Sequence, residues 1–270
     1  MDKKLTLKKT IANIAFHFNP FRTILDVARG EFRVLTYHSI TDDLIGDDNY
    51  QMTTPKELFK EQMRYLNENS YSVIPCGEMI DNIKENKEMP PKTICITFDD
   101  GFKDNLTNAA PILARYGFRA TIFLTVNFIG RSEQWLNWDD LMELTAMGIF
   151  SFGSHSLSHK KLHRLETNEL KNEMGLSKNI LEDHLRTTID LFAYPFGCYG
   201  SFDKSAVDAV KSAGYKAAFT TIAGSNTIES DPYLMRRTRI SWFDDKYEFA
   251  KELEGAYDWY ELWQKIRRTL

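Results

Sequence analysis

Cysteine is scarce in this chain of 270 residues. Only Cys76, Cys95 and Cys198 are present, and no two of them have the C-x-x-C spacing. An odd number of widely spaced cysteines argues against a disulfide framework and favours a reducing compartment. Cys95 lies within an apolar, strand-like run, so we expect it to be a buried core residue.

Long apolar runs are also missing. No stretch of 18 apolar residues occurs, so the sequence predicts no transmembrane helix. Residues 1–18 begin with basic side chains but lack a continuous apolar centre and a small-residue cleavage site. We therefore expect no signal peptide and a cytoplasmic location, either free or in peripheral contact with the inner membrane.

The charge balance argues against one class of partner. Lys and Arg total 34 and Asp and Glu total 38, for a formal net charge of −4, so no global positive field attracts nucleic acid. No internal repeat and no low-complexity linker divides the chain, and no feature indicates a protein partner. A chain of this length can bury a sizeable core in one large domain.

What the sequence does contain is an alternation of short β-rich runs with helical stretches. This alternation predicts an α/β fold with a mostly parallel sheet, and about seven strands suit a distorted (β/α) barrel better than a short open sheet. The expected strands are Phe32–Tyr37, Tyr71–Ile74, Thr93–Phe98, Ala120–Thr125, Ile149–Phe152, Asp190–Tyr194 and Lys216–Thr220.

Local signals mark the ends of two helices. Thr54, Pro55 and Glu57 predict a helix start in which Thr54 is the N-cap, Pro55 the first helical residue and Glu57 part of a capping box. Asn137 is expected to cap a second helix that Gly148 ends.

Both ends of the chain are basic and amphipathic. We divide the chain into an N-terminal segment (1–30), a central domain (31–245) and a C-terminal amphipathic helix (246–270). Either the two end segments pack on the domain, as apolar stripes most often do, or they rest on an anionic membrane surface. Their apolar positions are Leu7, Ile11, Ile14 and Phe18 at one end and Phe249, Leu253, Tyr260, Trp263, Ile266 and Leu270 at the other.

Two short motifs, far apart in the sequence, offer the ligands of one metal site. The segment Thr97–Gly101 (TFDDG) ends an apolar run, and the segment Ser154–His159 (SHSLSH) contains two histidines four residues apart. Three N/O ligands with an open coordination position are what a catalytic zinc site needs. A remaining carboxylate can then act as a base. His38 also follows an expected strand, and active-site residues of such barrels gather where strands end.

Each motif alone has a simpler interpretation. Asp-Gly is a common turn, and a pair of histidines can lie by chance on a solvated loop. Burying two adjacent carboxylates, however, costs several kcal/mol unless something compensates. A divalent cation compensates well and divides their roles, because one carboxylate ligates while the other stays free.

As a set, these motifs resemble the polysaccharide deacetylases of carbohydrate esterase family 4, the NodB-homology family. Arg33–Ile40 resembles the N-terminal strand of members with a circularly permuted motif order, such as the poly-N-acetylglucosamine deacetylases. Phe192–Gly197 resembles the later Pro-aromatic-Gly motif of the family, and Gly214–Thr220 matches the strand that follows. The resemblance covers roughly residues 32–240 in consistent order.

The resemblance implies a role for each motif residue. Asp100, His155 and His159 would bind a divalent metal, most often zinc, although cobalt, nickel or iron would fit the same ligands. Asp99 would be the general base and His38 the general acid. The remaining expectations are a backbone N–H of Phe196 for the oxyanion, with Tyr194, Pro195 and Trp242 as substrate-binding residues.

One position departs from the family pattern. Many members have an arginine where this chain has Ala193, and that arginine orients the base. Arg237 or Arg239 could supply the charge from another strand. A solvated basic strand end is the alternative for both.

The resemblance implies a metal-dependent hydrolase that removes N-acetyl groups from amino sugars of a polysaccharide or glycan. Two alternatives stay open. The first is a deacetylase or deformylase of a lipid-linked or soluble amino-sugar precursor on the cytoplasmic side. The second is a non-catalytic carbohydrate-binding scaffold, which the missing arginine favours and the full set of ligands, base and acid opposes.

Overall fold

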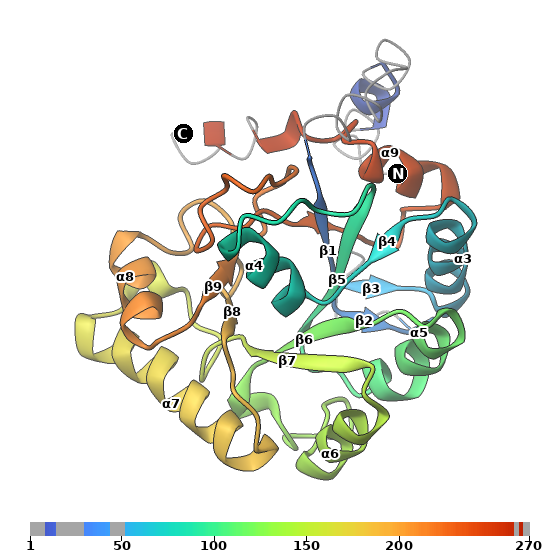
Figure 1. Ribbon diagram of the computed structural model, residues 1–270. Coiled ribbons are helices and arrows are strands. Elements are labelled where there is room, and N and C mark those ends of the chain that lie inside the picture. Colours follow the sequence, from blue (N-terminus) through green and yellow to red (C-terminus); the bar gives the residue numbers. More distant parts are fainter. Residues whose placement is uncertain (1–8, 15–29, 44–51, 262–264, 267–270) are drawn as a thin grey trace.

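Parallel strands form the centre of the molecule. The computed structural model describes residues 9–14, 30–43, 52–261 and 265–266 (Figure 1). Within them, an eight-stranded sheet has the order β10-β1-β5-β6-β7-β8-β9, and β4 pairs with the start of β5. All of its strand pairings are parallel, so the expected distorted (β/α) barrel is confirmed.

Several of these elements are short. The strands are β1 (Arg33–Tyr37), β2 (Ser39–Ile40), β3 (Thr53–Thr54), β4 (Ser72–Val73), β5 (Thr93–Asp100), β6 (Ala120–Leu124), β7 (Phe150–Ser154), β8 (Leu191–Ala193), β9 (Ala217–Phe219) and β10 (Thr238–Arg239). The α-helices around the sheet are α3 (Lys56–Glu68), α4 (Cys76–Lys84), α5 (Ala110–Tyr116), α6 (Trp138–Met147), α7 (Thr167–Leu185), α8 (Lys204–Ser212) and α9 (Lys246–Leu253).

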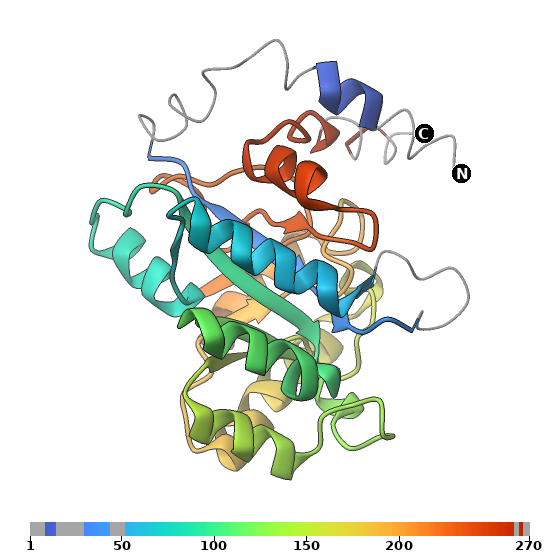
Figure 2. The same ribbon diagram turned by 90° about the vertical axis from the view of Figure 1, so that its right-hand side faces the viewer.

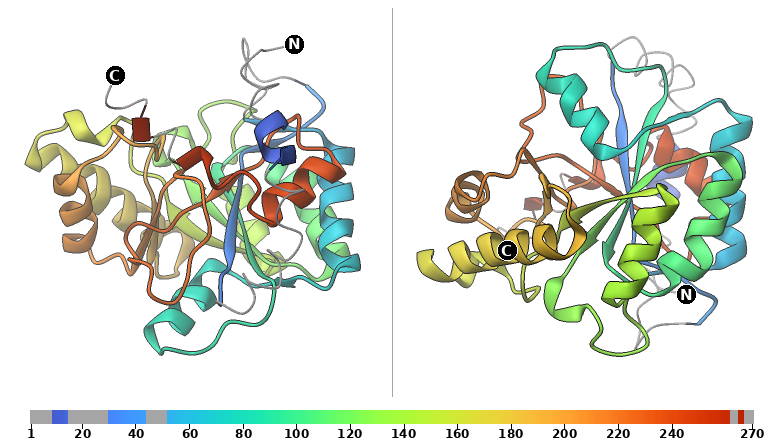
Figure 3. Two further views of the ribbon diagram at one scale, coloured as in Figure 1. Left: turned by 90° about the horizontal axis from the view of Figure 1, so that it is seen from above. Right: turned by 60° about the horizontal axis from the view of Figure 1, so that its bottom comes forward.

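The helices pack around the outside of the sheet. Helix α3 contacts both α5 and α9, and α7 contacts both α6 and α8. Figure 2 shows α3 and α5 along one flank, and Figure 3 shows α7 with its neighbours on the other. Helix α4 lies across one end of the barrel (Figure 1).

Alternating side chains of each strand fill two separate cores. On β5, Ile94, Ile96 and Phe98 belong to the large core beneath the helices, whereas Cys95 belongs to a second cluster inside the barrel. Successive side chains of a strand point to opposite faces, so Asp99 continues the inward row that contains Cys95. Cys95 is fully buried, as expected.

Of the two predicted helices, one has the expected ends and the other does not begin where it was expected. Asn137 caps α6 through a capping box with Asp140, and Gly148 ends that helix with φ 67°, which confirms the prediction. The prediction at Thr54 is wrong: α3 begins at Lys56, Pro55 occupies the N-cap position and no side chain caps the helix. Thr54 belongs instead to β3, because its backbone pairs with Ile40.

The described parts of the chain ends pack on the domain to different degrees. Phe249 and Leu253 of α9 are buried in the large core. Residues 9–14 are helical, and there Ala12 is buried against Ala256 and Tyr257, while Ile14 is 55% exposed. Ile266 is 48% exposed. Ile11 and Tyr260 are half-buried, and the other expected face positions, Leu7, Phe18, Trp263 and Leu270, lie outside the described residues. No helix in the described ranges has the length and apolar character to span a bilayer.

Candidate functional site

The motif residues meet where neighbouring strands end. Tyr37 of β1 pairs with Phe98 of β5, so His38, which follows β1, and Asp99, near the end of β5, stand at the same level of adjacent strands. On the other side of β5, Asp100 pairs with Leu124 of β6. Leu124 in turn pairs with Ser154, the last residue of β7, and His155 follows directly. The carboxyl ends of parallel strands therefore bring these segments together, as expected for a barrel.

Three candidate ligands converge there. Single donor atoms of Asp100, His155 and His159 all lie within 4.8 Å of one another. Asp100 Oδ1 is 3.4 Å from His159 Nε2 and 3.8 Å from His155 Nε2. Ligands about 2.1 Å from a tetrahedral zinc are separated by about 3.4 Å. The spacing of these donor atoms therefore fits one divalent metal ion.

The orientation of His155 is fixed by a neighbouring strand. Its Nδ1 lies 2.8 Å from the carbonyl oxygen of Ala193 at the end of β8. A proton on Nδ1 leaves Nε2 with a free lone pair, which is the usual arrangement behind a metal-binding imidazole. Nε2 is the atom that faces Asp100, so the tautomer suits a ligand.

Left-handed backbone is concentrated at this site. Eight described non-glycine residues have positive φ, a conformation that side chains disfavour. Four of them belong to the site motifs: Asp100 (73°), Ser156 (69°), His159 (57°) and Phe196 (62°). At Asp100 the left-handed turn interrupts the in-and-out alternation of β5. Two consecutive carboxylates can therefore both face the site.

Burial sets the charge states of the three candidate ligands. It raises the pKa of Asp100 to about 7, helped by the negative charge of Asp99. It lowers the pKa of His155 to about 3 and also lowers that of His159. Two neutral imidazoles and a carboxylate that a cation would stabilise form a donor set suited to a divalent metal.

The second carboxylate, Asp99, is held by an arginine. Arg237 donates from Nη1 to Oδ1 and from Nη2 to Oδ2 of Asp99, each at 2.7 Å. Arg237 is 1% exposed, and its Nε donates to the carbonyl oxygen of Thr220 at 2.8 Å. Burial disfavours the charged form of Asp99, but Arg237 outweighs it and holds the pKa of Asp99 below its usual range.

Of the two candidate arginines, Arg237 makes this pair. Its guanidinium lies over the ring of Phe123, 5.5 Å from the centroid, in the inner cluster that also contains Ala193. The positive charge beside Asp99 therefore comes from Arg237, in the segment before β10, whereas position 193 carries only the small side chain of alanine. Arg239, within β10, is exposed.

His38 stands at the end of β1. Burial lowers its pKa to about 4, and the negative charge of Asp99 opposes that shift. Its Nδ1 atom is buried and has no hydrogen-bond partner among the described residues. His38 is thus a neutral imidazole next to the carboxylate that the arginine holds.

Phe196 lies beside the candidate ligand His159. Its ring is 45% exposed and lies 4.8 Å from the His159 ring, centroid to centroid. Thr221 holds this turn, because its Oγ1 donates to Phe196 O at 2.7 Å and its N–H to Gly197 O at 2.9 Å. A Cβ at Gly197 would lie 2.6 Å from Thr221 N, so only glycine fits there.

The expected substrate-binding residues are placed differently. Tyr194 is fully buried: it stacks on Phe202 at 4.2 Å and donates a hydrogen bond to Tyr233 O. Its strand position points toward the helices, so its side chain offers no surface to a sugar, contrary to our expectation. Pro195 is buried and Trp242 is half-buried in the turn after β10.

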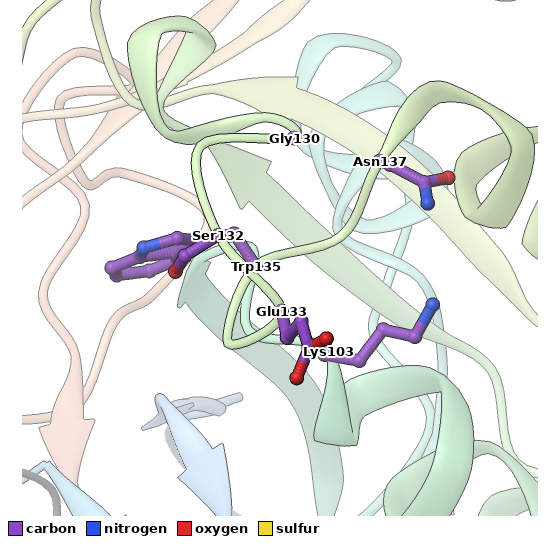
Figure 4. Close-up of a pocket in the computed structure, with 6 residues that line it drawn as sticks. All are labelled: Lys103, Gly130, Ser132, Glu133, Trp135 and Asn137. Carbon is purple, nitrogen blue, oxygen red and sulfur yellow. The ribbon is translucent and has the colours of Figure 1, made fainter.

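A pocket of about 550 Å³ lies near the site. Figure 4 shows Lys103 and Glu133 on one side of the loop 130–137 and the indole of Trp135 on the other. Trp135 lies 4.5 Å from the ring of Phe128, which in turn lies 5.8 Å from His159. An aromatic wall therefore joins this loop to a candidate metal ligand.

Glu173 is not among the site residues that the sequence predicts. This buried carboxylate on α7 accepts the backbone N–H groups of Leu157 and Ser158, between the two histidines. A signal was available, since Glu173 lies on the same helical face as Leu170, Met174 and Leu181, all buried. A charge on an apolar helix face indicates a specific partner.

Known proteins resemble this chain in both sequence and fold. Residues 86–218 match the family model "Polysaccharide deacetylase". YxkH of Bacillus subtilis (strain 168), whose name assigns it to the polysaccharide deacetylases, is 30% identical over 208 residues, 77% of this chain and 71% of YxkH. The poly-beta-1,6-N-acetyl-D-glucosamine N-deacetylase of Staphylococcus epidermidis is 26% identical over 223 residues, 77% of this chain and 73% of that protein.

Solved structures agree. BC0361, a polysaccharide deacetylase from Bacillus cereus, has a TM-score of 0.72 and 28% identity, covering 83% of this chain and 69% of BC0361. The Streptococcus pyogenes deacetylase PplD, solved with acetate, has a TM-score of 0.73 and covers 83% of this chain and 98% of PplD; at 22% identity it supports the fold alone. The matching motifs, the shared fold and the identity to YxkH lead to one conclusion: this chain belongs to the polysaccharide deacetylase family.

Proposed function

We propose that this deacetylase removes N-acetyl groups from a polysaccharide of β-1,6-linked N-acetyl-D-glucosamine, with the help of a divalent metal ion. The staphylococcal relatives, by their names, act on that polymer, and they align with this chain over most of their length.

Asp100, His155 and His159 would hold the metal. Zinc is our first choice, and cobalt, nickel or iron would accept the same ligands. When bound, such an ion polarises the amide carbonyl group and lowers the pKa of a coordinated water toward ~7.

Asp99 is the proposed general base. Arg237 keeps its carboxylate ionised and fixes its orientation, so it can accept a proton at neutral pH. The attacking water forms a bond to the acyl carbon as Asp99 takes the proton. Asp99 Oδ2 lies 3.9 Å from Nε2 of the candidate ligand His155, and this short distance supports the proposed role.

His38 and Phe196 complete the proposed reaction. The backbone N–H of Phe196 would donate to the oxyanion, an interaction whose loss typically costs about 10²–10³ in rate. His38, a neutral imidazole in the resting site, would take up the proton that Asp99 removed from the water and deliver it to the amine as the C–N bond breaks, since an unprotonated amine is a poor leaving group. The products are acetate and a free amino sugar.

The observation that supports this proposal most strongly is that two adjacent carboxylates have different partners. Asp99 is clamped by a buried guanidinium, while Asp100 faces two neutral imidazoles. A scaffold that only binds carbohydrate has no need of such a division, so the arrangement favours catalysis over the non-catalytic alternative.

Replacement of the base tests the proposal. We expect Asp99→Asn to bind zinc as the wild-type chain does, while acetate release from β-1,6-linked N-acetylglucosamine oligomers falls by about 10²–10⁴-fold. Asp208→Asn, an exposed aspartate of α8, is the matched control and should match wild-type rates.

Other outcomes would change the assignment. Full activity of Asp99→Asn would remove Asp99 as the base. Acetate release from β-1,4-linked oligomers but not from β-1,6-linked ones would overturn the polymer, and release only from a monosaccharide would favour the precursor alternative.

A further inference from the structure

The segment that joins the two candidate histidine ligands is not a helix. Ser156 and His159 both have left-handed backbone, with φ values of 69° and 57°. Such conformations cost about 1–3 kcal/mol each and persist only where the surroundings impose them. Something must therefore hold the segment 154–159 in place.

Helix α7 holds this segment at two points. The carboxylate of Glu173 accepts from the backbone N–H of Leu157 at 3.0 Å, from that of Ser158 at 2.9 Å, and from the Ser158 hydroxyl. Ser177, one turn further along the same helix face, accepts from the hydroxyl of Ser154 at 2.8 Å. The helix thus grips the segment just before His155 and just before His159.

Burial makes the grip of Glu173 strong. Glu173 is only 5% exposed, and a buried carboxylate is tolerated where donors surround it. Hydrogen bonds to a charged group are worth more than neutral ones. Without this acceptor, two N–H groups would have to find new partners, and the segment would be free to leave its left-handed conformation.

The affected ligand is His159. It follows Ser158 directly, and its own N–H donates to the hydroxyl of Ser156 at 3.0 Å inside the same turn. His155, by contrast, has a separate restraint at Ala193 O. Loss of the carboxylate would therefore disturb the His159–Asp100 spacing of 3.4 Å before it disturbed His155.

We infer that Glu173 is a positioning residue that sets the metal affinity of the site through the loop carrying His159. The inference rests on the proposed metal-binding role of that histidine. Its effect does not require Glu173 to touch either metal or substrate.

Two variants and one control test the inference in the full chain. Glu173→Ala removes the acceptor, and Glu173→Gln keeps its shape and one acceptor oxygen. Glu182→Ala is the matched control, because Glu182 lies on the same helix and accepts the backbone N–H of Ile189 at 2.9 Å, away from the histidines. Zinc affinity is measured by competition with a chromophoric chelator, and thermal unfolding is measured on the metal-free proteins.

We expect the zinc dissociation constant to rise about 10–100-fold in Glu173→Ala, the range found when a group behind a metal ligand is removed. Glu173→Gln should show a smaller rise, Glu182→Ala none, and excess zinc should restore deacetylation by Glu173→Ala. Where Glu173→Ala does not fold, Glu173→Gln decides.

Two results would overturn the inference in distinguishable ways. If Glu173 variants lose thermal stability but bind zinc as tightly as wild type, Glu173 is purely structural and the proposed function stands. If the wild-type chain itself binds no zinc, the proposed metal site fails, and the inference fails with it.

Discussion

At the scale of single residues, the adjacent carboxyl groups of Asp99 and Asp100 have pKa values that are shifted in opposite directions. The pKa of Asp99 is held low by Arg237, whereas burial and the charge of Asp99 raise that of Asp100 to about 7. Pairs of titratable groups whose surroundings separate their pKa values often have distinct catalytic roles. The sequence shows two adjacent aspartates, but their difference arises from partners far along the chain.

Arg237→Lys tests the clamp on the base. Lysine keeps the charge but cannot donate two parallel bonds, so we expect the pKa of Asp99 to rise and kcat/KM to fall by roughly 10-fold, about 1.4 kcal/mol. Because a base acts when deprotonated, a higher pKa moves the acid limb of the pH profile to higher pH. Arg236→Lys is the control, since Arg236 pairs with Glu261 outside the site. An acid limb that does not move would contradict the proposed clamp.

His38→Gln tests the proton donor by a change of leaving group. We expect hydrolysis of the N-acetyl amide to fall by about 10²–10⁴-fold. Hydrolysis of an aryl acetate should change far less, because a phenolate leaves without a proton. Both rates are measured on the same preparation, which makes the ester an internal control for folding. Equal losses on the two substrates would show that His38 does not act as the acid.

At the scale of elements, strand periodicity explains which predictions succeeded. Apolar runs located β1 and β4 through β9 within a few residues, and inward alternation carries Asp99 into the barrel. β5 extends two residues beyond the predicted Thr93–Phe98 because Asp99 and Asp100 still pair with β6. Two-residue strands such as β2, β3 and β10 are too short to show a period, and the β2–β3 pairing is what displaced the predicted cap at Thr54.

Helix α6 allows a direct test of a predicted element end. In Asn137→Ala the N–H of Asp140 loses its acceptor, so we expect a loss of about 1 kcal/mol in the free energy of unfolding and a Tm lower by about 2–4 °C. Calorimetry measures both quantities. Glu143→Ala, an exposed position in the same helix, should stay within about 0.5 kcal/mol of wild type. Equal stability of the two variants would mean that the cap contributes nothing.

At the scale of the whole molecule, the sequence predicted the barrel and the set of motifs but not all of their partners. The choice of Arg237 over Arg239 depends on contacts that span 138 positions, and Glu173 reaches its loop only after α7 packs beside β7. Tyr194 was predicted to bind substrate, but its side chain, like that of Phe192 two residues earlier, points out of the barrel into the large core beneath the helices. Membrane contact by the end segments and a cytoplasmic location stay predictions.

The central claim is that Asp100, His155 and His159 hold one cation beside Asp99. Anomalous diffraction at the zinc edge, from a crystal of the zinc-loaded chain, tests it most directly. We predict a single strong peak about 2.0–2.2 Å from one oxygen of Asp100 and from Nε2 of both histidines, with Asp99 still bound to Arg237. A peak held by other residues, or a zinc-loaded crystal with none among these three, would contradict the account.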